Sequence, residues 1–324
     1  MTGDTAKASQ TIWPTATKES QPATDREPNR PAGQHRSNNS LSLSDGAAAG
    51  CRWVRFVLMF DLGAYLDRIE LRGSPTLAAV HRAHAMSIPF ENLGPWSGQP
   101  VSLDLAAIER KLVVERQGGY CFEQNLLLQA GLQQLGFEVD MLLARARTGG
   151  WPGPVRPRTH LMLRVWIDDQ PWLADVGFGF GGLLEPLPFA AGGPYEQSGW
   201  RFRVVWDEPE LVLQAAVGDE WVDQYGVIAS PVPFVDVQTA NWLTSTHPES
   251  PFLRGPIISA TAADGRRTLI RSDRQHGFIL VEQTPTARET TPLHGDEIAA
   301  VIHERFGLNG GRVPRRGQIA RPLA

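Results

Sequence analysis

The chain has 324 residues, enough for one large domain or for two or three smaller ones, and its 42% hydrophobic content excludes global disorder. Its formal net charge of -4, with acidic and basic residues interleaved, gives no support for a nucleic-acid partner or a basic membrane-binding surface. It has only 2 cysteines, Cys51 and Cys121, and neither a signal-peptide core nor an apolar run of about 20 residues, so we expect a reducing, cytoplasmic compartment and neither disulfides nor a membrane span.

The first part of the chain differs in composition from the rest. Residues 1 to about 50 are rich in Ser, Thr, Pro, Gln, Asn and Ala, with almost no bulky aliphatic residues. Such a segment buries too little apolar surface to offset the entropy of ordering, so we predict a disordered tail over residues 1–58. A second hypothesis is that translation starts at Met59, directly before the first ordered pattern, so that the tail is not part of the native protein.

A helical bundle that carries Cys121 is predicted for residues 59–138. Apolar residues recur there at helical spacing, with Asp61 as a cap for the first helix and Gly136 as a stop for the last. The predicted helices cover residues 61–69, 76–86, 103–114 and 121–135.

The apolar period then changes to that of strands. Short segments rich in Val, Leu and Trp, separated by Gly, Pro and Asp, predict a meander or small β-barrel over residues 139–234. An interdomain helix is expected over 235–254 and an α/β lid over 255–324, with a terminal helix that stops at Gly307. The fold class is therefore α+β, with helices first, then strands, then a mixed segment. The predicted strands cover 137–147, 161–167, 172–176, 201–206, 211–217, 257–261, 268–271 and 278–281.

Cys121 lies where a glycine pair, Gly118-Gly119, leads into the start of a predicted apolar helix. Unpaired backbone N–H groups and the positive end of the helix dipole at such a position favour thiolate over thiol. A thiolate is a ready nucleophile if a base lies nearby.

Two further residues at element ends can complete a catalytic triad with this cysteine. His160 lies at the start of one predicted strand and Asp175 at the end of the next. Adjacent antiparallel strands can hold their ends within hydrogen-bond reach, so the histidine can take the thiol proton while the aspartate fixes its tautomer. A nucleophile on a helix that packs against a strand-borne His and Asp is the layout of papain-like cysteine enzymes.

Each of these residues also has an ordinary structural interpretation. A lone cysteine is commonly a small core residue, His81 and His84 are helical core histidines, and an aspartate before Val-Gly is usually a turn residue. Joint placement at element ends favours the catalytic interpretation. A zinc site is a weaker alternative because close ligand pairs are missing, and no phosphate-binding or dinucleotide loop follows a predicted strand, so no metal is expected.

Four motifs together resemble those of the arylamine N-acetyltransferases. The segment 240–252 also resembles the helix that follows the barrel in that family, and the likeness extends from about residue 59 to the C-terminal helix. The four motifs are Gly118-Gly119-Tyr120-Cys121-Phe122-Glu123, Ile88-Pro89-Phe90-Glu91-Asn92-Leu93, Thr159-His160 and Asp175-Val176-Gly177-Phe178-Gly179.

The sequence departs from the family pattern at Gln117. The family usually places an arginine there, and this arginine is expected to pair with the glutamate that Glu91 matches. Gln117 can hydrogen-bond Glu91 only as a neutral donor, and Arg116 can reach across if the loop shifts. We therefore expect a less stable Cys121 loop with its chemistry retained.

The resemblance implies a ping-pong acyl transfer with acetyl-CoA as co-substrate and a small aromatic amine or hydrazine as acceptor. Cys121 takes the acetyl group as a thioester, and the amine then attacks it while His160 assists proton transfer and Asp175 orients the imidazole. Aromatic side chains suit a flat acceptor, although each of them also has a core-packing interpretation. The implied acceptor contacts are Phe90, Tyr120, Phe178 and Phe252, and the implied CoA contact is Gly179.

Three alternatives remain open at this point. A cysteine hydrolase would use water or a peptide amine as the acceptor. An amide synthase of the same family would close a macrolactam on a carrier-bound polyketide. A non-catalytic binding module with this fold would carry a broken triad, whereas all three members are present here.

Overall fold

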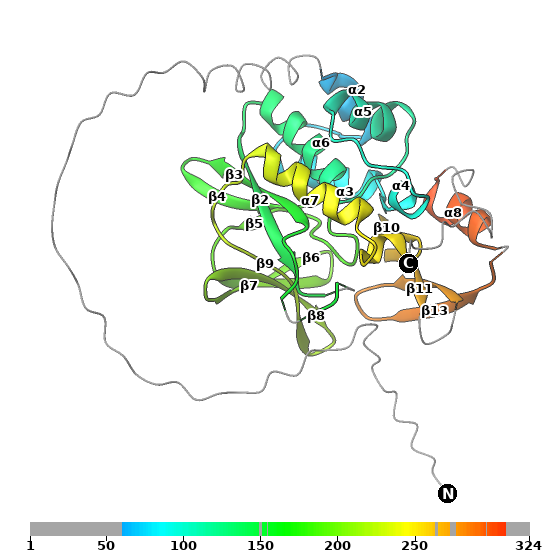
Figure 1. Ribbon diagram of the computed structural model, residues 1–324. Helices are drawn as coiled ribbons and strands as arrows, with labels where there is room; N and C mark the ends of the chain where they lie inside the picture. The colour runs from blue at the N-terminus through cyan, green and yellow to red at the C-terminus, as the bar shows by residue number, and fades with distance from the viewer. Residues whose placement is uncertain are drawn as a thin grey trace, which may run out of the picture. The chain divides into compact units, whose positions relative to one another are not determined.

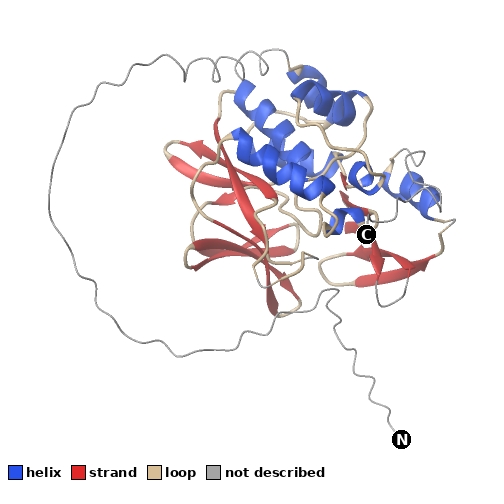
Figure 2. Cartoon of the chain, in the orientation of Figure 1, coloured by secondary structure: helices blue, strands red, loops and turns tan. Residues whose placement is uncertain are grey.

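The computed structural model describes residues 60–148, 151–153, 155–262, 265–272, 277–295 and 297–308. The chain divides into two units, Met1–Trp53 and Val54–Ala324, and the described residues belong to the second. The predicted tail over 1–58, the hypothesis about Met59 and residue Cys51 lie outside the described residues. The α+β class is confirmed, since the helices gather together beside two separate groups of strands (Figures 1 and 2).

The first part of the described chain is helical, as the sequence predicts. The Asp61 carboxylate caps the first helix by accepting from the backbone N–H of Ala64 at 2.9 Å, and Thr76 caps the second in the same way. The last helix ends before Gly136, which has a φ of 90°. The predicted helix over 103–114 is divided into a short α-helix and a π-helical turn. The helices are α2 (Leu62–Arg68), α3 (Leu77–Ser87), α4 (Leu93–Trp96), α5 (Leu105–Glu109), η1 (Arg110–Val114) and α6 (Cys121–Gln134).

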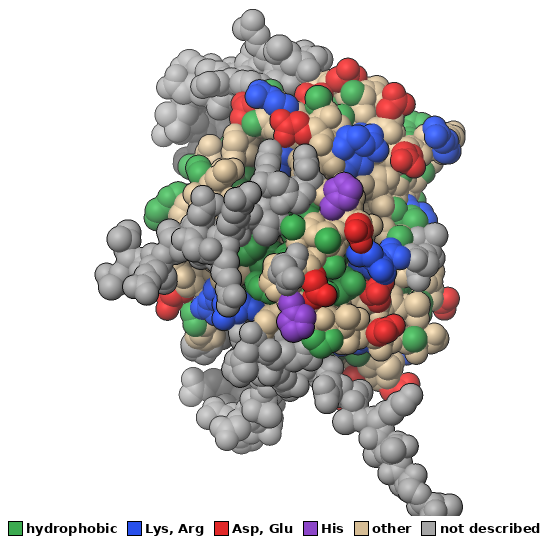
Figure 3. Space-filling model, turned by 90° about the vertical axis from the view of Figure 1, so that its right-hand side faces the viewer, with side chains coloured by type: hydrophobic (Ala, Val, Ile, Leu, Met, Phe, Trp, Pro, Cys, Tyr) green, Lys and Arg blue, Asp and Glu red, His purple; other side chains and the backbone are tan. Residues whose placement is uncertain are grey.

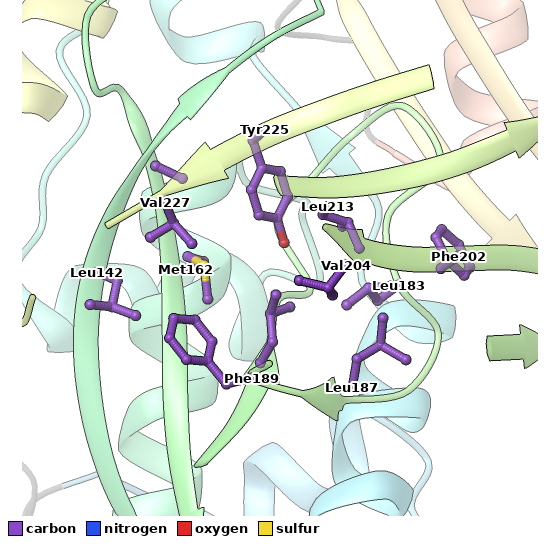
Figure 4. Packing of buried hydrophobic residues seen from close by; sticks show 12 residues of the cluster. Leu142, Met162, Leu183, Leu187, Phe189, Phe202, Val204, Leu213, Tyr225 and Val227 are labelled. Atoms are coloured by element: carbon purple, nitrogen blue, oxygen red, sulfur yellow. The ribbon is translucent and has the colours of Figure 1, made fainter. Parts of the chain in front are cut away.

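The predicted barrel is an eight-stranded antiparallel sheet in the order β5-β4-β3-β2-β9-β8-β7-β6, which curves until it is nearly closed (Figure 1). Helix α6 packs against β2 and β3. Met162, Phe189, Leu213 and Tyr225 point toward one another in its interior (Figure 4). The strands are β2 (Glu138–Ala146), β3 (His160–Ile167), β4 (Gln170–Ala174), β5 (Leu187–Pro188), β6 (Gly192–Gln197), β7 (Trp200–Asp207), β8 (Glu210–Val217) and β9 (Glu220–Val227).

A second antiparallel sheet follows, in the order β1-β10-β11-β12-β13. Helix α7 (Phe234–Thr246) and the 3-10 turn η2 (Pro251–Leu253) connect the two sheets, and the expected helix over 235–254 therefore ends earlier than predicted. Helix α8 (Ile298–Phe306) packs its apolar face on the second sheet and ends at Gly307. The strands are β1 (Phe90–Glu91), β10 (Ile257–Ala262), β11 (Gly265–Ser272), β12 (Gly277–Gln283) and β13 (Arg288–Leu293).

The described surface is mixed in character. On the face shown in Figure 3, acidic and basic side chains are interspersed with each other and with hydrophobic ones. In the described part of the chain, no helix combines the length and the hydrophobicity that crossing a bilayer requires.

The two-residue strand β1 joins the second sheet to the loop before Cys121. Phe90 pairs with Ser259 of β10 and forms a parallel bridge to Gly119. The backbone N–H of Glu91 donates to the carbonyl oxygen of Gly119 at 3.0 Å. The start of α6 is therefore anchored to a sheet whose other strands come from the last part of the chain.

Asn92, the residue after β1, holds this junction in place. Its side chain is fully buried. The amide nitrogen donates to the carbonyl oxygens of Phe252 at 2.8 Å and Gly255 at 2.9 Å, and the amide oxygen accepts from the N–H of Ile257 at 2.6 Å. One side chain thus satisfies three backbone groups of the segment that enters β10.

Replacing Asn92 with Ala should destabilise the protein. We expect Asn92→Ala to lower the free energy of unfolding by about 3 kcal/mol, because each buried backbone group left without a partner costs about 1–3 kcal/mol. Urea denaturation measures this change. The exposed Gln99 is the control, since Gln99→Ala should stay within about 0.5 kcal/mol of the parent. Equal effects of the two substitutions would contradict the anchoring role.

Candidate active site

Cys121 is the first residue of α6, so its side chain lies at the positive end of the helix, as predicted. The residue is 3% exposed, and its Sγ lies 3.6 Å from the carbonyl oxygen of Thr159. The glycine pair before it is required by packing: a Cβ at Gly118 would lie 2.3 Å from the carbonyl oxygen of Pro89. The loop can therefore lie directly against the segment that enters β1.

His160 and Asp175 meet beside this cysteine. His160 opens β3, and Asp175 directly follows the neighbouring strand β4. The imidazole Nε2 lies 2.7 Å from a carboxylate oxygen of Asp175, and Cys121 is close enough to the same ring to contribute to the rise of its pKa. A Cβ at Gly177 would lie 2.6 Å from the Cα of Cys121, so only glycine lets the Asp175 loop approach the nucleophile this closely. The structure therefore brings the three predicted residues together.

The buried carboxylate controls the charge of the imidazole. Burial alone lowers the pKa of His160, but the charge and hydrogen bond of Asp175, with the contact to Cys121, outweigh it and raise the pKa from 6.5 to about 10. Burial raises the pKa of Asp175, and the His160 imidazole together with hydrogen bonds from Asn125 and Gly177 lowers it overall. The pair is therefore an imidazolium and a carboxylate at neutral pH.

Asn125 is a site residue that the sequence analysis missed. Its amide nitrogen donates to Asp175 at 3.0 Å and to the carbonyl oxygen of Leu161 at 2.7 Å, while its amide oxygen accepts from the N–H of Val176 at 3.2 Å. Asn125 follows Cys121 by four residues in α6, a spacing that places both on the same helix face. The spacing of four residues from Cys121 is therefore the sequence feature that could have identified Asn125.

His81 supports Asp175 from the opposite side. Its Nε2 accepts from the backbone N–H of Asp175 at 3.0 Å, so its Nδ1 carries the proton and donates to the carbonyl oxygen of Leu184 at 3.0 Å. Burial lowers the pKa of His81 and keeps it neutral. These bonds fit the interpretation of His81 as a core histidine. They also show that it lies against the triad, which the sequence did not predict.

The aromatic residues proposed for the acceptor fall into two groups. Phe178 packs edge-on against His160 at 5.1 Å between ring centroids. The ring centroids of Phe90 and Phe252 are 6.3 Å apart, and those of Phe252 and Tyr120 are 5.9 Å apart. Tyr120 differs from the expectation of direct contact with substrate, because its side chain is fully buried and its hydroxyl donates to Oδ1 of Asn241. It supports Phe252 from behind.

Gly179, the implied CoA contact, is a buried packing position. A Cβ there would lie 2.5 Å from the ring of Phe90, so glycine is required for the Asp175 loop to lie on that ring. Within the described ranges, no group of three or more His, Cys, Asp and Glu side chains is arranged to hold a metal ion.

The expectation that Gln117 or Arg116 pairs with Glu91 is wrong, because neither side chain reaches the Glu91 carboxylate. Gln117 donates to the carbonyl oxygen of Glu115, and the exposed Arg116 lies 4.0 Å from Glu70. The cation that pairs with Glu91 is Lys111 of η1.

The Lys111 ammonium is shared by two buried carboxylates. It lies 2.7 Å from Glu91 and 2.8 Å from Glu123, the third residue of α6. The Glu123 carboxylate also accepts from the N–H of Tyr120 at 3.1 Å, and Glu91 accepts from the N–H of Leu93 at 2.5 Å. The expected weakening of the Cys121 loop therefore finds no support, since a cation still ties β1 to the start of α6.

One cation against two carboxylates leaves a surplus of negative charge in this cluster. Burial lowers the pKa of Lys111, but Glu123 and Glu91 outweigh it and raise the pKa above its usual value. Burial and the nearby Glu91 raise the pKa of Glu123 despite its contact with Lys111.

Comparison with known proteins gives consistent results. A sequence model of a family described as N-acetyltransferase matches residues 75–312. The arylamine N-acetyltransferase of Mycolicibacterium smegmatis is 38% identical over 273 residues, which cover 82% of this chain and 98% of that protein. A Salmonella typhimurium protein named arylamine N-acetyltransferase / N-hydroxyarylamine O-acetyltransferase is 33% identical over 255 residues, covering 76% and 88%.

Solved structures agree with these sequence matches. The structure of Mycobacterium marinum arylamine N-acetyltransferase has a TM-score of 0.73 to this chain at 35% identity, covering 80% of this chain and 97% of that one. Its complex with CoA has a TM-score of 0.72 at 34% identity, with the same coverage. The comparisons confirm the family that the four motifs indicate.

Removing the shared cation should destabilise the protein strongly. We expect Lys111→Met to lower the free energy of unfolding by about 3–5 kcal/mol, because it leaves two buried carboxylates without a counter-charge. The loss of stability should shrink from pH 8 to pH 5, because burial raises the pKa of Glu123 and the folded state then binds more protons than the unfolded chain as the pH falls. Denaturant unfolding at both pH values measures this.

Two further variants separate the explanations for this effect. Lys111→Met combined with Glu123→Gln should lose less stability than Lys111→Met alone, because the stranded charge is removed. Gln117→Ala should change stability by at most about 0.5 kcal/mol. A larger loss in Gln117→Ala than in Lys111→Met would restore Gln117 as the partner of Glu91.

The imidazolium should control the reactivity of the thiol. In the parent protein, the rate of Cys121 alkylation by iodoacetamide should vary little between pH 7 and pH 9, because the pKa of His160 is about 10. His160→Gln removes the imidazolium beside the sulfur, so alkylation at pH 7 should be about tenfold slower than in the parent and should rise with pH. The exposed His303 supplies the control, His303→Gln. Parent-like alkylation of His160→Gln at pH 7 would exclude the ion pair.

Proposed function

This chain belongs to the arylamine N-acetyltransferase family of acyltransferases, and we propose that it transfers an acetyl group from acetyl-CoA to the nitrogen of a small arylamine or arylhydrazine. The names of the relatives support the amine acceptor, and the complex of the Mycobacterium marinum relative with CoA supports the donor. The observation that carries the mechanism is the 2.7 Å hydrogen bond between His160 and Asp175 beside Cys121, whose Sγ lies 3.6 Å from the carbonyl oxygen of Thr159, the residue before His160.

In the first step, the Cys121 thiolate attacks the carbonyl carbon of the acetyl thioester. The new S–C bond forms acetyl-Cys121, the bond to the CoA sulfur breaks, and the departing thiolate takes the proton from the His160 imidazolium. Negative charge develops on the carbonyl oxygen during the attack. Backbone N–H groups in the first turn of α6 have no acceptor within the helix and can stabilise that charge.

In the second step, the neutral amine attacks the acetyl carbonyl of acetyl-Cys121. The N–C bond forms, His160 takes the amine proton and Cys121 leaves as a thiolate, which restores the starting state. Asp175 stabilises the imidazolium at both ends of the cycle. Because an arylamine is nucleophilic when neutral, the step needs a proton acceptor and no strong base.

The rings near the triad suit a flat acceptor. Phe178 lies against the imidazole, and Phe90 and Phe252 form the second aromatic group, so an aryl ring held on these faces would place its amine near the sulfur. Tyr120 contributes by fixing Phe252.

Intact mass spectrometry after mixing with acetyl-CoA tests the proposal. We expect a gain of one acetyl group mapped to Cys121, its loss when an arylamine is added, and no gain in Cys121→Ser. Acetylation at another residue, or turnover in Cys121→Ser, would exclude the covalent route. Rapid loss of the acetyl group to water without any amine, together with peptide cleavage, would favour the hydrolase alternative.

A further inference from the structure

A single buried arginine connects the second sheet with the loop beside the triad. Arg266 of β11 is 6% exposed, and its Nη2 donates to the carbonyl oxygen of Gly182 at 2.8 Å. Its guanidinium carbon lies 4.1 Å from the centroid of the Trp200 ring and 5.9 Å from that of Phe202. One face of the guanidinium is therefore packed against aromatic rings, and one of its nitrogens is hydrogen-bonded to a backbone carbonyl.

The charge of this arginine is not balanced by any carboxylate among the described residues. Its Nε has no hydrogen-bond partner, and Nη1 makes no hydrogen bond within the described chain. Other arginines of the same protein differ: Arg147 contacts Asp207, Glu210 and Asp223. Burial lowers the pKa of Arg266 to about 9, so it remains a cation at neutral pH. A buried cation without a counter-charge is costly, which favours a site whose anion is supplied by a ligand.

The loop that Arg266 contacts leads directly to the imidazole. The N–H of Gly182 donates to the carbonyl oxygen of Phe178 at 3.1 Å, and the Phe178 ring packs on His160. Nη1 lies against Gly181, where a Cβ would come within 2.8 Å of it. A side chain at Gly181 would therefore collide with Nη1, so only glycine lets the loop lie against the guanidinium.

We propose that Arg266 binds a phosphate group of the acyl donor, an inference that rests on the proposed function. A thioester held at Cys121 places the phosphates of CoA at the far end of the pantetheine arm, outside the triad. A guanidinium presents planar paired donors that match phosphate oxygens. Arg266 offers such donors from β11, against the loop that adjoins the triad, and no carboxylate among the described residues competes for them.

Donors with and without phosphate test this role. In Arg266→Met, kcat/KM for acetyl-CoA should fall about 10- to 100-fold, the loss typical of one charged hydrogen-bonding group. The value for S-acetylpantetheine, which has no phosphate, should stay at the parent level. Acetyl-dephospho-CoA separates the two phosphate positions: a fall that persists with this donor assigns Arg266 to the diphosphate, and a fall that disappears assigns it to the 3′-phosphate.

A matched control lies at the next position of the strand. Arg267 contacts Glu282, and Arg267→Met should leave the ratio of the two kcat/KM values unchanged. An equal fall with acetyl-CoA and S-acetylpantetheine in Arg266→Met would make Arg266 a packing residue and overturn the proposal. No fall with either donor would overturn it as well.

Measurements on the parent protein test the same point if Arg266→Met does not fold. Calorimetry should show tighter binding of CoA than of pantetheine, and inorganic phosphate should weaken CoA binding by competition. Equal affinities for CoA and pantetheine would overturn the proposal. Failure of the proposed function is distinguishable, because the parent protein would then gain no acetyl group at Cys121 from any of the three donors.

Discussion

The buried contact between His160 and Asp175 is the interaction on which the rest of the site depends. Burial opposes charge on both groups, and the pair stays ionised because each charge stabilises the other and the carboxylate accepts further hydrogen bonds. Asn125 supplies one donor from the nucleophile's own helix, and the N–H of Gly177 supplies another at 2.9 Å. The backbone that carries the acid is itself held by His81. The residues around the triad thus act on the imidazole through Asp175, by keeping its carboxylate bonded and in place.

A second buried ionic cluster fixes the other side of the α6 N-terminus. Lys111 joins Glu91 of β1 to Glu123 of α6, and Asn92 then fastens β1 to the segment that enters β10. The position of Cys121 is therefore set jointly by the helical part and by the last sheet. Strands from beyond residue 255 are therefore needed to hold Cys121 in position.

The sequence predicted those parts of the fold whose apolar pattern is local. The α6 helix, most strands of the large sheet and the element ends that carry His160 and Asp175 follow from periodicity and turn residues. Strands β1, β5, β6, β9 and β13 were not predicted: β1 and β5 have two residues each, β6 begins Gly-Gly-Pro, β9 mixes polar and apolar residues on both faces, and β13 is largely exposed. Asn125 and Arg266 were missed because their roles arise only from contacts between distant segments.

Gln117, at the motif position expected to hold an arginine, shows why position along the chain alone gives the wrong partner for Glu91. The motif predicts a cation next to Glu91, supplied by a residue adjacent to the glycine pair. The π-helical turn η1 instead presents Lys111, six residues before Gln117, to both carboxylates. A lysine supplies a point charge on a flexible stem and can reach two acids from a distant backbone position, which a glutamine amide cannot replace. The constraint that persists is a buried positive charge at the start of α6, and the fold determines which residue provides it.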